Sequence, residues 1–218
     1  MVAGNSSRRN STLPPQDSPQ SLWSEQDKSQ RFLSQRALGF TCLDYNGINE
    51  GALQRHALPS KSFIESSCPD GLRLEIMFPS CWDGVNLDSI DHQSHVAYPD
   101  LLMEGQCPEG FFTRLPSLYY ETIWDTTLFK GVDGQFLLSN GDTTGLGYHG
   151  DFLNGWEIDV LQEAIDSCKN LSGRVEDCPP FRIQSLNASS SCKLSIPDIL
   201  RDDDCEGPRY GPCGKIAM

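Results

Sequence analysis

Nine cysteines scattered along 218 residues constrain this chain more than any other feature of its sequence. No two of them form a Cys-x-x-Cys pair, so the spacing does not indicate a cysteine-rich zinc ribbon. Scattered cysteines in an acidic, polar chain are typical of a disulfide framework made in an oxidising compartment. We therefore expect a disulfide-bonded, extracellular fold. The cysteines are Cys42, Cys68, Cys81, Cys107, Cys168, Cys178, Cys192, Cys205 and Cys213.

Secretion has further support, and one alternative stays open. Four glycosylation sequons begin at Asn5, Asn10, Asn170 and Asn187. The first residues, however, lack the apolar segment of a signal peptide, and an odd cysteine count leaves one thiol without an internal partner. An amino-terminal half absent from this chain would explain both facts, whereas a cytosolic protein with free thiols is the alternative interpretation.

Charge and hydropathy exclude several partners. The net charge is −13, and such a surface repels nucleic acid and anionic lipid. No stretch approaches the ~20 apolar residues that a membrane-spanning helix needs. We therefore expect neither a nucleic-acid partner nor a membrane span.

The hydrophobic pattern predicts a mainly β fold with two helices. Alternation predicts strands over 72–78, 117–124, 135–139 and 181–184, and helical spacing predicts helices over 24–38 and 156–168. The expected class is a β-rich α+β fold, in one interpretation a sandwich, with two peripheral helices. Three segments are expected: an irregular segment over 1–22, the main domain over 23–192, and an acidic, Gly/Pro-rich tail over 193–218 in which Cys205 and Cys213 could close a loop.

Residues 79–99, here called the signature segment, hold the densest set of reactive side chains. With His149 from a glycine-rich loop, His92 and His95 could bind a divalent metal, because imidazole and carboxylate ligands suit zinc, copper or iron. The alternative is that the histidines only brace an irregular loop. The candidate catalytic residues are Asp91, His92, His95, His149 and Asp151, and the candidate metal ligands are His92, His95 and His149.

A second hypothesis is acid–base chemistry on a glycan, for which the carboxylates and histidines could act as a pair. Aromatic rings could then stack on sugar rings, although aromatic residues beside strands are more often core. The candidate substrate-binding residues are Trp82, Tyr98, Trp124 and Tyr148.

Several motifs resemble one family. They are Cys68-Pro-Asp-Gly-Leu-Arg, Met77-Phe-Pro-Ser-Cys-Trp-Asp-Gly, Glu121-Thr-Ile-Trp-Asp-Thr and Gly145-Leu-Gly-Tyr-His-Gly-Asp-Phe-Leu-Asn-Gly-Trp. Over roughly residues 36–184 the chain resembles the carboxy-terminal portion of a fungal secreted domain of unknown function, number nineteen ninety-six in that series. Members of that family carry an amino-terminal portion with a histidine pair, and some carry carbohydrate-binding modules.

The resemblance implies a secreted protein directed at carbohydrate, with cell-wall polysaccharide as the expected partner and with or without catalysis. It assigns no reaction. The hypothesis from another class is a non-catalytic structural domain of the cell wall, in which the histidines and aspartates brace loops.

Overall fold

The computed structural model describes residues 1–200 except 15, 49, 173 and 194. The chain divides into two compact units. The first comprises Met1–Phe152 and the second begins at Leu153. The predicted loop between Cys205 and Cys213 lies outside the described residues.

A three-stranded antiparallel sheet forms the centre of the first unit. Its order is β2 (Leu38–Cys42), β3 (Leu72–Met77) and β7 (Tyr119–Trp124). Strict alternation in β3 sends Leu72, Leu74 and Ile76 to one face, where they join two hydrophobic clusters. The strands predicted over 72–78 and 117–124 are confirmed.

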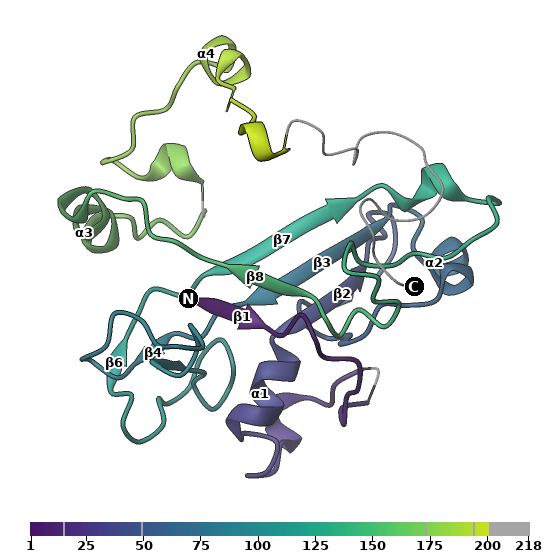
Figure 1. Ribbon diagram of the computed structural model, residues 1–218, viewed down its shortest axis with the longest axis horizontal. Coiled ribbons are helices and arrows are strands. Elements are labelled where there is room, and N and C mark those ends of the chain that lie inside the picture. Colours follow the sequence, from purple (N-terminus) through teal and green to yellow (C-terminus); the bar gives the residue numbers. More distant parts are fainter. Residues whose placement is uncertain (15, 49, 173, 194, 201–218) are drawn as a thin grey trace. The chain divides into compact units, whose positions relative to one another are not determined.

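Two smaller sheets complete the strands of this unit. The ribbon of β1 (Val2–Gly4) and β8 (His149–Asp151) packs on the apolar face of the central sheet, because Ala3 joins Leu38, Ile76 and Phe78 in one cluster. In Figure 1 the ribbon crosses over the sheet. The second small sheet has the order β5 (Val96–Ala97), β4 (Cys81–Trp82) and β6 (Thr113–Arg114). The class is thus mainly β, as predicted.

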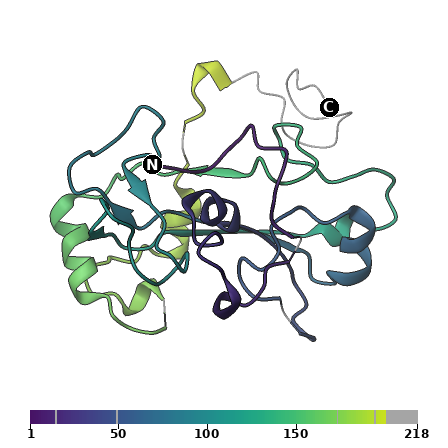
Figure 2. The same ribbon diagram turned by 90° about the horizontal axis from the view of Figure 1, so that it is seen from below.

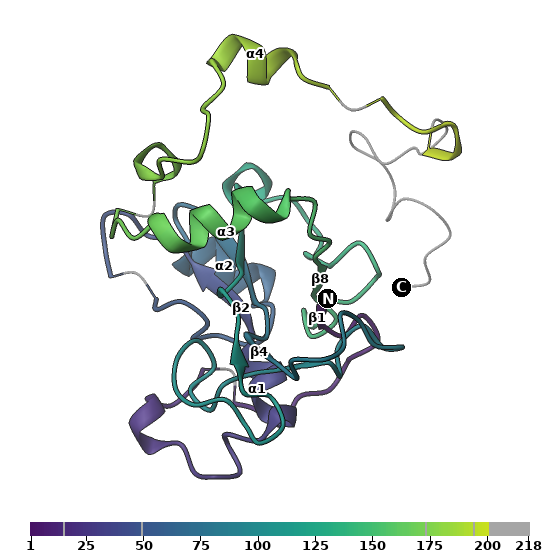
Figure 3. The ribbon, with the colours of Figure 1, turned by 90° about the vertical axis from the view of Figure 1, so that its left-hand side faces the viewer.

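Two helices flank the sheets. Helix α1 (Gln30–Arg36) contacts β1 and β2, and lies beside them in Figures 1 and 3. Helix α2 (Lys61–Ser67) begins at Ser60, whose hydroxyl accepts from Phe63 N. It packs beside the 3₁₀ helix η2 (Thr126–Phe129), as Figures 1 and 2 show. A further 3₁₀ turn, η1, spans Gln20–Leu22.

The second unit contains only short helices among its described residues. They are α3 (Ile158–Ser167), η3 (Val175–Asp177), α4 (Leu186–Ser191) and η4 (Asp198–Leu200). Trp156 stacks on Phe181 at 5.2 Å between ring centroids. The segment 181–184, predicted as a strand, is irregular, because no neighbouring strand in the described part offers it backbone partners.

Three disulfides link Cys42 to Cys68, Cys81 to Cys107, and Cys168 to Cys178. The predicted disulfide framework is therefore present. Cys192 is exposed and has no partner within the residues described. No helix among those residues is long and apolar enough to cross a membrane.

Four further expectations need correction. The segment 1–22 is not wholly irregular, because β1 pairs with β8. No local sequence pattern predicts this pairing. The helix predicted over 24–38 is shorter, because Leu38 enters β2. Residues 135–139 form an irregular wall and not a strand. Four α-helices, and not two, occur in the described part of the chain.

Candidate functional site

A pocket of about 650 Å³ opens on the first unit, above the apolar face of the central sheet. This volume is in the range of small-molecule sites. Strands β3 and β7 supply its floor, η2 and residues 132–140 supply one wall, and Tyr148 and His149 supply the other. The pocket therefore gathers residues that are far apart in the sequence.

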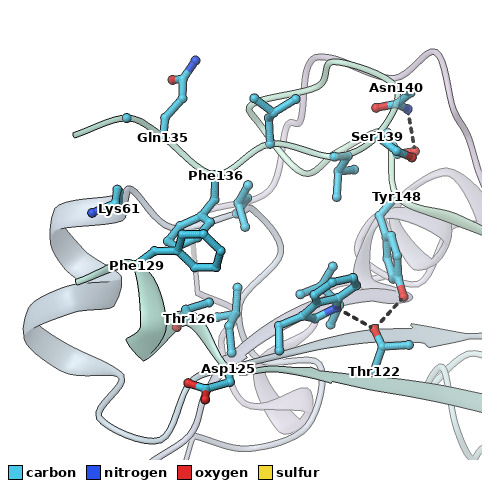
Figure 4. A pocket seen from close by; sticks show the side chains of 18 of the residues that line it. Lys61, Thr122, Asp125, Thr126, Phe129, Gln135, Phe136, Ser139, Asn140 and Tyr148 are labelled. Carbon is cyan, nitrogen blue, oxygen red and sulfur yellow. Dashed lines mark hydrogen bonds between the residues drawn. The ribbon is translucent and has the colours of Figure 1, made fainter. Parts of the chain in front are cut away.

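One end of the pocket, here called the apolar end, is built around two aromatic rings, with Lys61, Thr126 and Gln135 beside them. Phe129 and Phe136 meet edge to face, with ring centroids 6.0 Å apart and an interplanar angle of 89°. Figure 4 shows these two rings together, near Lys61. Phe136 packs against the buried cluster that contains Leu72 and Leu74, and both leucines line the pocket.

The opposite end carries polar groups joined by hydrogen bonds. Trp124 Nε1 donates to Thr122 Oγ1 at 3.3 Å, and the Thr122 and Tyr148 hydroxyls lie 3.3 Å apart. Figure 4 shows Thr122 and Tyr148 at this end, with Asn140 beyond them. Trp124 is 57% exposed, so part of its side chain is open to a ligand. This end combines a flat apolar surface with hydroxyl groups.

His149 lines the pocket, and no residue in the described part of the chain hydrogen-bonds its Nε2. Its Nδ1 lies 3.0 Å from the carbonyl oxygen of Gly147, which can only accept, so Nδ1 carries the proton. Nε2 of the neutral ring is then an acceptor. An exposed imidazole of this kind can accept from a ligand hydroxyl or act as a base.

The buried carboxylate of Asp142 fixes the loop that carries Tyr148 and His149. Its oxygens accept from Thr144 N at 2.9 Å, from Thr144 Oγ1 at 2.7 Å and from Gly147 N at 2.7 Å. Burial opposes its charge, but these hydrogen bonds outweigh that effect and lower the pKa of Asp142. Arg9 Nε lies 3.6 Å from Asp142 Oδ1.

The same loop requires a glycine at position 145. Gly145 has φ +78°, a conformation that favours glycine, and a Cβ there would meet Phe40 at 2.6 Å.

The opposite wall is held by two carboxylates. Asp125 caps η2, since its side chain accepts from Thr127 N. Glu65 of α2 accepts from Gly131 N at 2.9 Å and pairs with Lys61. This wall is thus attached to α2 by the hydrogen bond of Glu65, and its helix η2 follows directly after β7.

The signature segment forms a separate, tightly hydrogen-bonded loop. Asp91 Oδ1 accepts from Ser94 N at 2.8 Å, Gln93 N at 3.0 Å and Ser89 Oγ at 2.8 Å. These bonds hold the pKa of Asp91 well below its ordinary value. His95 is buried, with Nδ1 2.9 Å from Ser89 Oγ. The Asp91 carboxylate therefore stabilises the turns of its own loop.

His92 belongs to the same loop. Its ring lies 2.8 Å from the Asp88 carboxylate, and its backbone has φ +54°, which is uncommon for a residue with a side chain. The hydrogen bond with His92 lowers the pKa of Asp88. The His92 carbonyl accepts from Val2 N at 2.8 Å. This anchors the loop to β1.

Strand β1 connects the two regions. On one side Gln93 Nε2 donates to Gly4 O at 3.1 Å, and on the other Gly4 is in register with His149. The signature loop and the pocket loop therefore both attach to β1. The three candidate ligand histidines do not converge, and no group of three or more His, Cys, Asp or Glu side chains in the described part of the chain is placed to hold a metal ion.

The structure separates the candidate substrate-binding residues. Trp124 and Tyr148 line the pocket. Tyr98 is core: its hydroxyl donates to Met77 O at 3.0 Å, and burial raises its pKa. Trp82 donates its Nε1 to Asn86 O at 2.6 Å within the signature segment. Asp151 lies exposed in β8.

Sequence reasoning missed the apolar end of the pocket. Phe129 ends η2, and Val132 and Phe136 lie in the irregular segment that follows it. Their signal in the sequence is large apolar residues in a polar, glycine-containing stretch. Large side chains in a polar, turn-rich segment have no core of their own, and could have been examined as a ligand surface.

Comparisons with known proteins give one match. A family model described as a domain of unknown function, DUF1996, matches residues 1–156, which include the whole of the first unit. No curated protein and no solved structure matches the chain.

Proposed function

The chain belongs to the DUF1996 family of domains of unknown function, and we propose that its pocket binds carbohydrate in an extracellular protein. One observation carries the proposal: a partly exposed aromatic side chain, Trp124, stands beside the linked hydroxyls of Thr122 and Tyr148. A sugar ring has an apolar face of C–H groups and a polar edge of hydroxyls. Such a ring stacks on an aromatic side chain and exchanges hydrogen bonds at its edge.

Two further properties support this assignment. The net charge of −13 disfavours anionic polymers, so a neutral glycan is the better ligand. Three disulfides and the exposed asparagines of all four sequons suit an extracellular, glycosylated protein. Cell-wall polysaccharide is the proposed natural source of the ligand.

Binding is the activity proposed, and His149 would contribute an acceptor at the pocket edge. The signature loop has a different proposed role. The hydrogen bonds of Asp91, His92 and His95 stay within the loop or attach it to β1, which favours bracing over catalysis for these three residues.

The test is calorimetric titration of the disulfide-bonded full chain with the hexasaccharides of β-1,3-glucan, cellulose, chitin and mannan. We expect one of these glycans to bind, and Trp124→Ala to weaken that binding at least tenfold. Trp156→Ala is the matched control, because Trp156 is 50% exposed but lies outside the pocket. Equal losses in both variants, or no binding to the unmodified chain, would overturn the proposal.

A further inference from the structure

The pocket extends beyond its polar end, and the rest of its lining is mainly carbon. The Phe129 and Phe136 rings and the side chains of Leu72 and Leu74 present carbon to the cavity. Figure 4 places Phe129 and Phe136 at one side of the pocket, and Thr122, Tyr148 and Asn140 at the other. A ligand that fills the cavity must therefore carry two kinds of surface.

A second sugar unit does not suit the apolar end. Those of its hydroxyls that lie against the Phe129 and Phe136 rings would lose water without gaining a partner, which is unfavourable. Lys61 and Gln135 offer partners beside the rings and not between them. An alkyl or aryl group has no such requirement, and each buried methylene strengthens binding by about fourfold.

The apolar end is also accessible. Phe129 is 51% exposed and Val132 is 53% exposed, so a ligand can reach these side chains without opening the core. An exposed cluster of large apolar side chains beside a cavity marks a ligand surface more often than a solvated one.

Resting on the carbohydrate function proposed above, we propose that the pocket recognises an amphipathic glycoside. The sugar ring stacks on Trp124 and meets the hydroxyls of Thr122 and Tyr148. The apolar aglycone, an alkyl chain or an aromatic ring, lies against Phe129 and Phe136. The recognised class is thus a glycoconjugate, and a bare polysaccharide fills only part of the site.

The experiment compares three probes by titration of the full chain. They are the methyl glycoside, the hexyl glycoside of the same sugar, and 1-hexanol, with glucose, mannose and N-acetylglucosamine as the sugars. We expect one hexyl glycoside to bind at least fiftyfold more tightly than its methyl counterpart and at least tenfold more tightly than hexanol. Phe129→Ala should remove most of the preference for hexyl over methyl, measured as the ratio of the two affinities in the variant and in the unmodified chain.

Phe112→Ala is the matched control, because Phe112 is 79% exposed and does not line the pocket. Phe136→Leu is a second test of the same preference for hexyl over methyl, and it keeps an apolar side chain at a partly buried position. Equal affinity for methyl and hexyl glycosides would overturn this inference and leave the carbohydrate function standing. Equal affinity for hexanol and the hexyl glycoside, or binding of none of the probes, would also overturn this inference, and the hexasaccharide titration decides separately whether the carbohydrate function stands.

Discussion

Arg36 holds Asp17 in a bidentate ion pair, with Nε 2.6 Å from Oδ2 and Nη2 3.1 Å from Oδ1. The side chains are 3% and 9% exposed, so the pair is shielded from water. The same guanidinium donates to Asp27 O at 2.9 Å and lies 4.4 Å from the Trp23 ring centroid. A segment that its composition marks as irregular is therefore fixed to α1.

Replacing Arg36 with lysine should destabilise the protein by about 2–4 kcal/mol, because an ammonium group cannot reproduce the planar fork and leaves a buried carboxylate poorly paired. Equilibrium unfolding in guanidinium chloride measures the change in the free energy of unfolding. Arg31→Lys, on the same helix but exposed, is the control and should have little effect. A small effect at Arg36 would show that the pair is not important for stability.

Acid should weaken the fold below about pH 4. Burial opposes the charge of Asp17, but the neighbouring His56 and Arg36 side chains outweigh that effect and lower the pKa of Asp17. A group whose folded pKa is lowered contributes stability above its unfolded value of about 3.9, and that contribution disappears as the pH falls through the folded pKa. Melting temperatures between pH 7 and pH 2 should therefore fall at the acid end. Asp17→Asn should melt lower at pH 7 and show a weaker acid dependence, whereas parallel curves would contradict the assignment.

Asp142→Asn should affect both stability and binding. The amide presents a donor where the carboxylate accepted from Thr144 and Gly147, so one buried partner loses its hydrogen bond at a cost of about 1–3 kcal/mol. The loop that positions Tyr148 and His149 should loosen, and affinity for the best glycan should fall. Thermal melting and calorimetry measure the two effects. Asp133→Asn, at an exposed position, is the control for stability.

The Cys81–Cys107 disulfide closes a segment whose ends are 26 residues apart in sequence. Replacing both cysteines with alanine should destabilise the protein by about 2–5 kcal/mol. Non-reducing peptide mapping should find this pair together with Cys42–Cys68 and Cys168–Cys178. A different set of pairs would require another fold around the signature segment.

Much of the central sheet could be predicted from sequence, because β3 alternates strictly and β7 is rich in aromatic and β-branched residues. Helix α3 was also predicted over nearly its full length, because its apolar residues repeat at helical spacing. Strand β1 was not predicted, since its partner His149–Asp151 is remote in the sequence and its own three residues carry no pattern.

The candidate site was predicted only in part. Trp124, Tyr148 and His149 do share a pocket, which motif proximity alone could not establish. Local spacing suggested that His92 and His95 might act with His149, but the positive φ of His92 and the hydrogen bond of His95 to Ser89 commit both to their own loop. Side-chain direction in an irregular loop depends on backbone angles that residue types do not determine.

The β1–β8 ribbon also sets the order in which this protein can fold. Met1 N donates to Phe152 O across 151 residues of sequence, and the two strands pair immediately beside that bond. During synthesis β1 leaves the ribosome long before β8, so it cannot form the ribbon while the strands of the central sheet emerge. The signature loop can reach β1 earlier, because its contacts with Val2 and Gly4 involve only residues 92 and 93. Long-range closure of this kind slows folding, and an unpaired strand during that interval is open to wrong partners, which gives a chaperone a defined segment to protect.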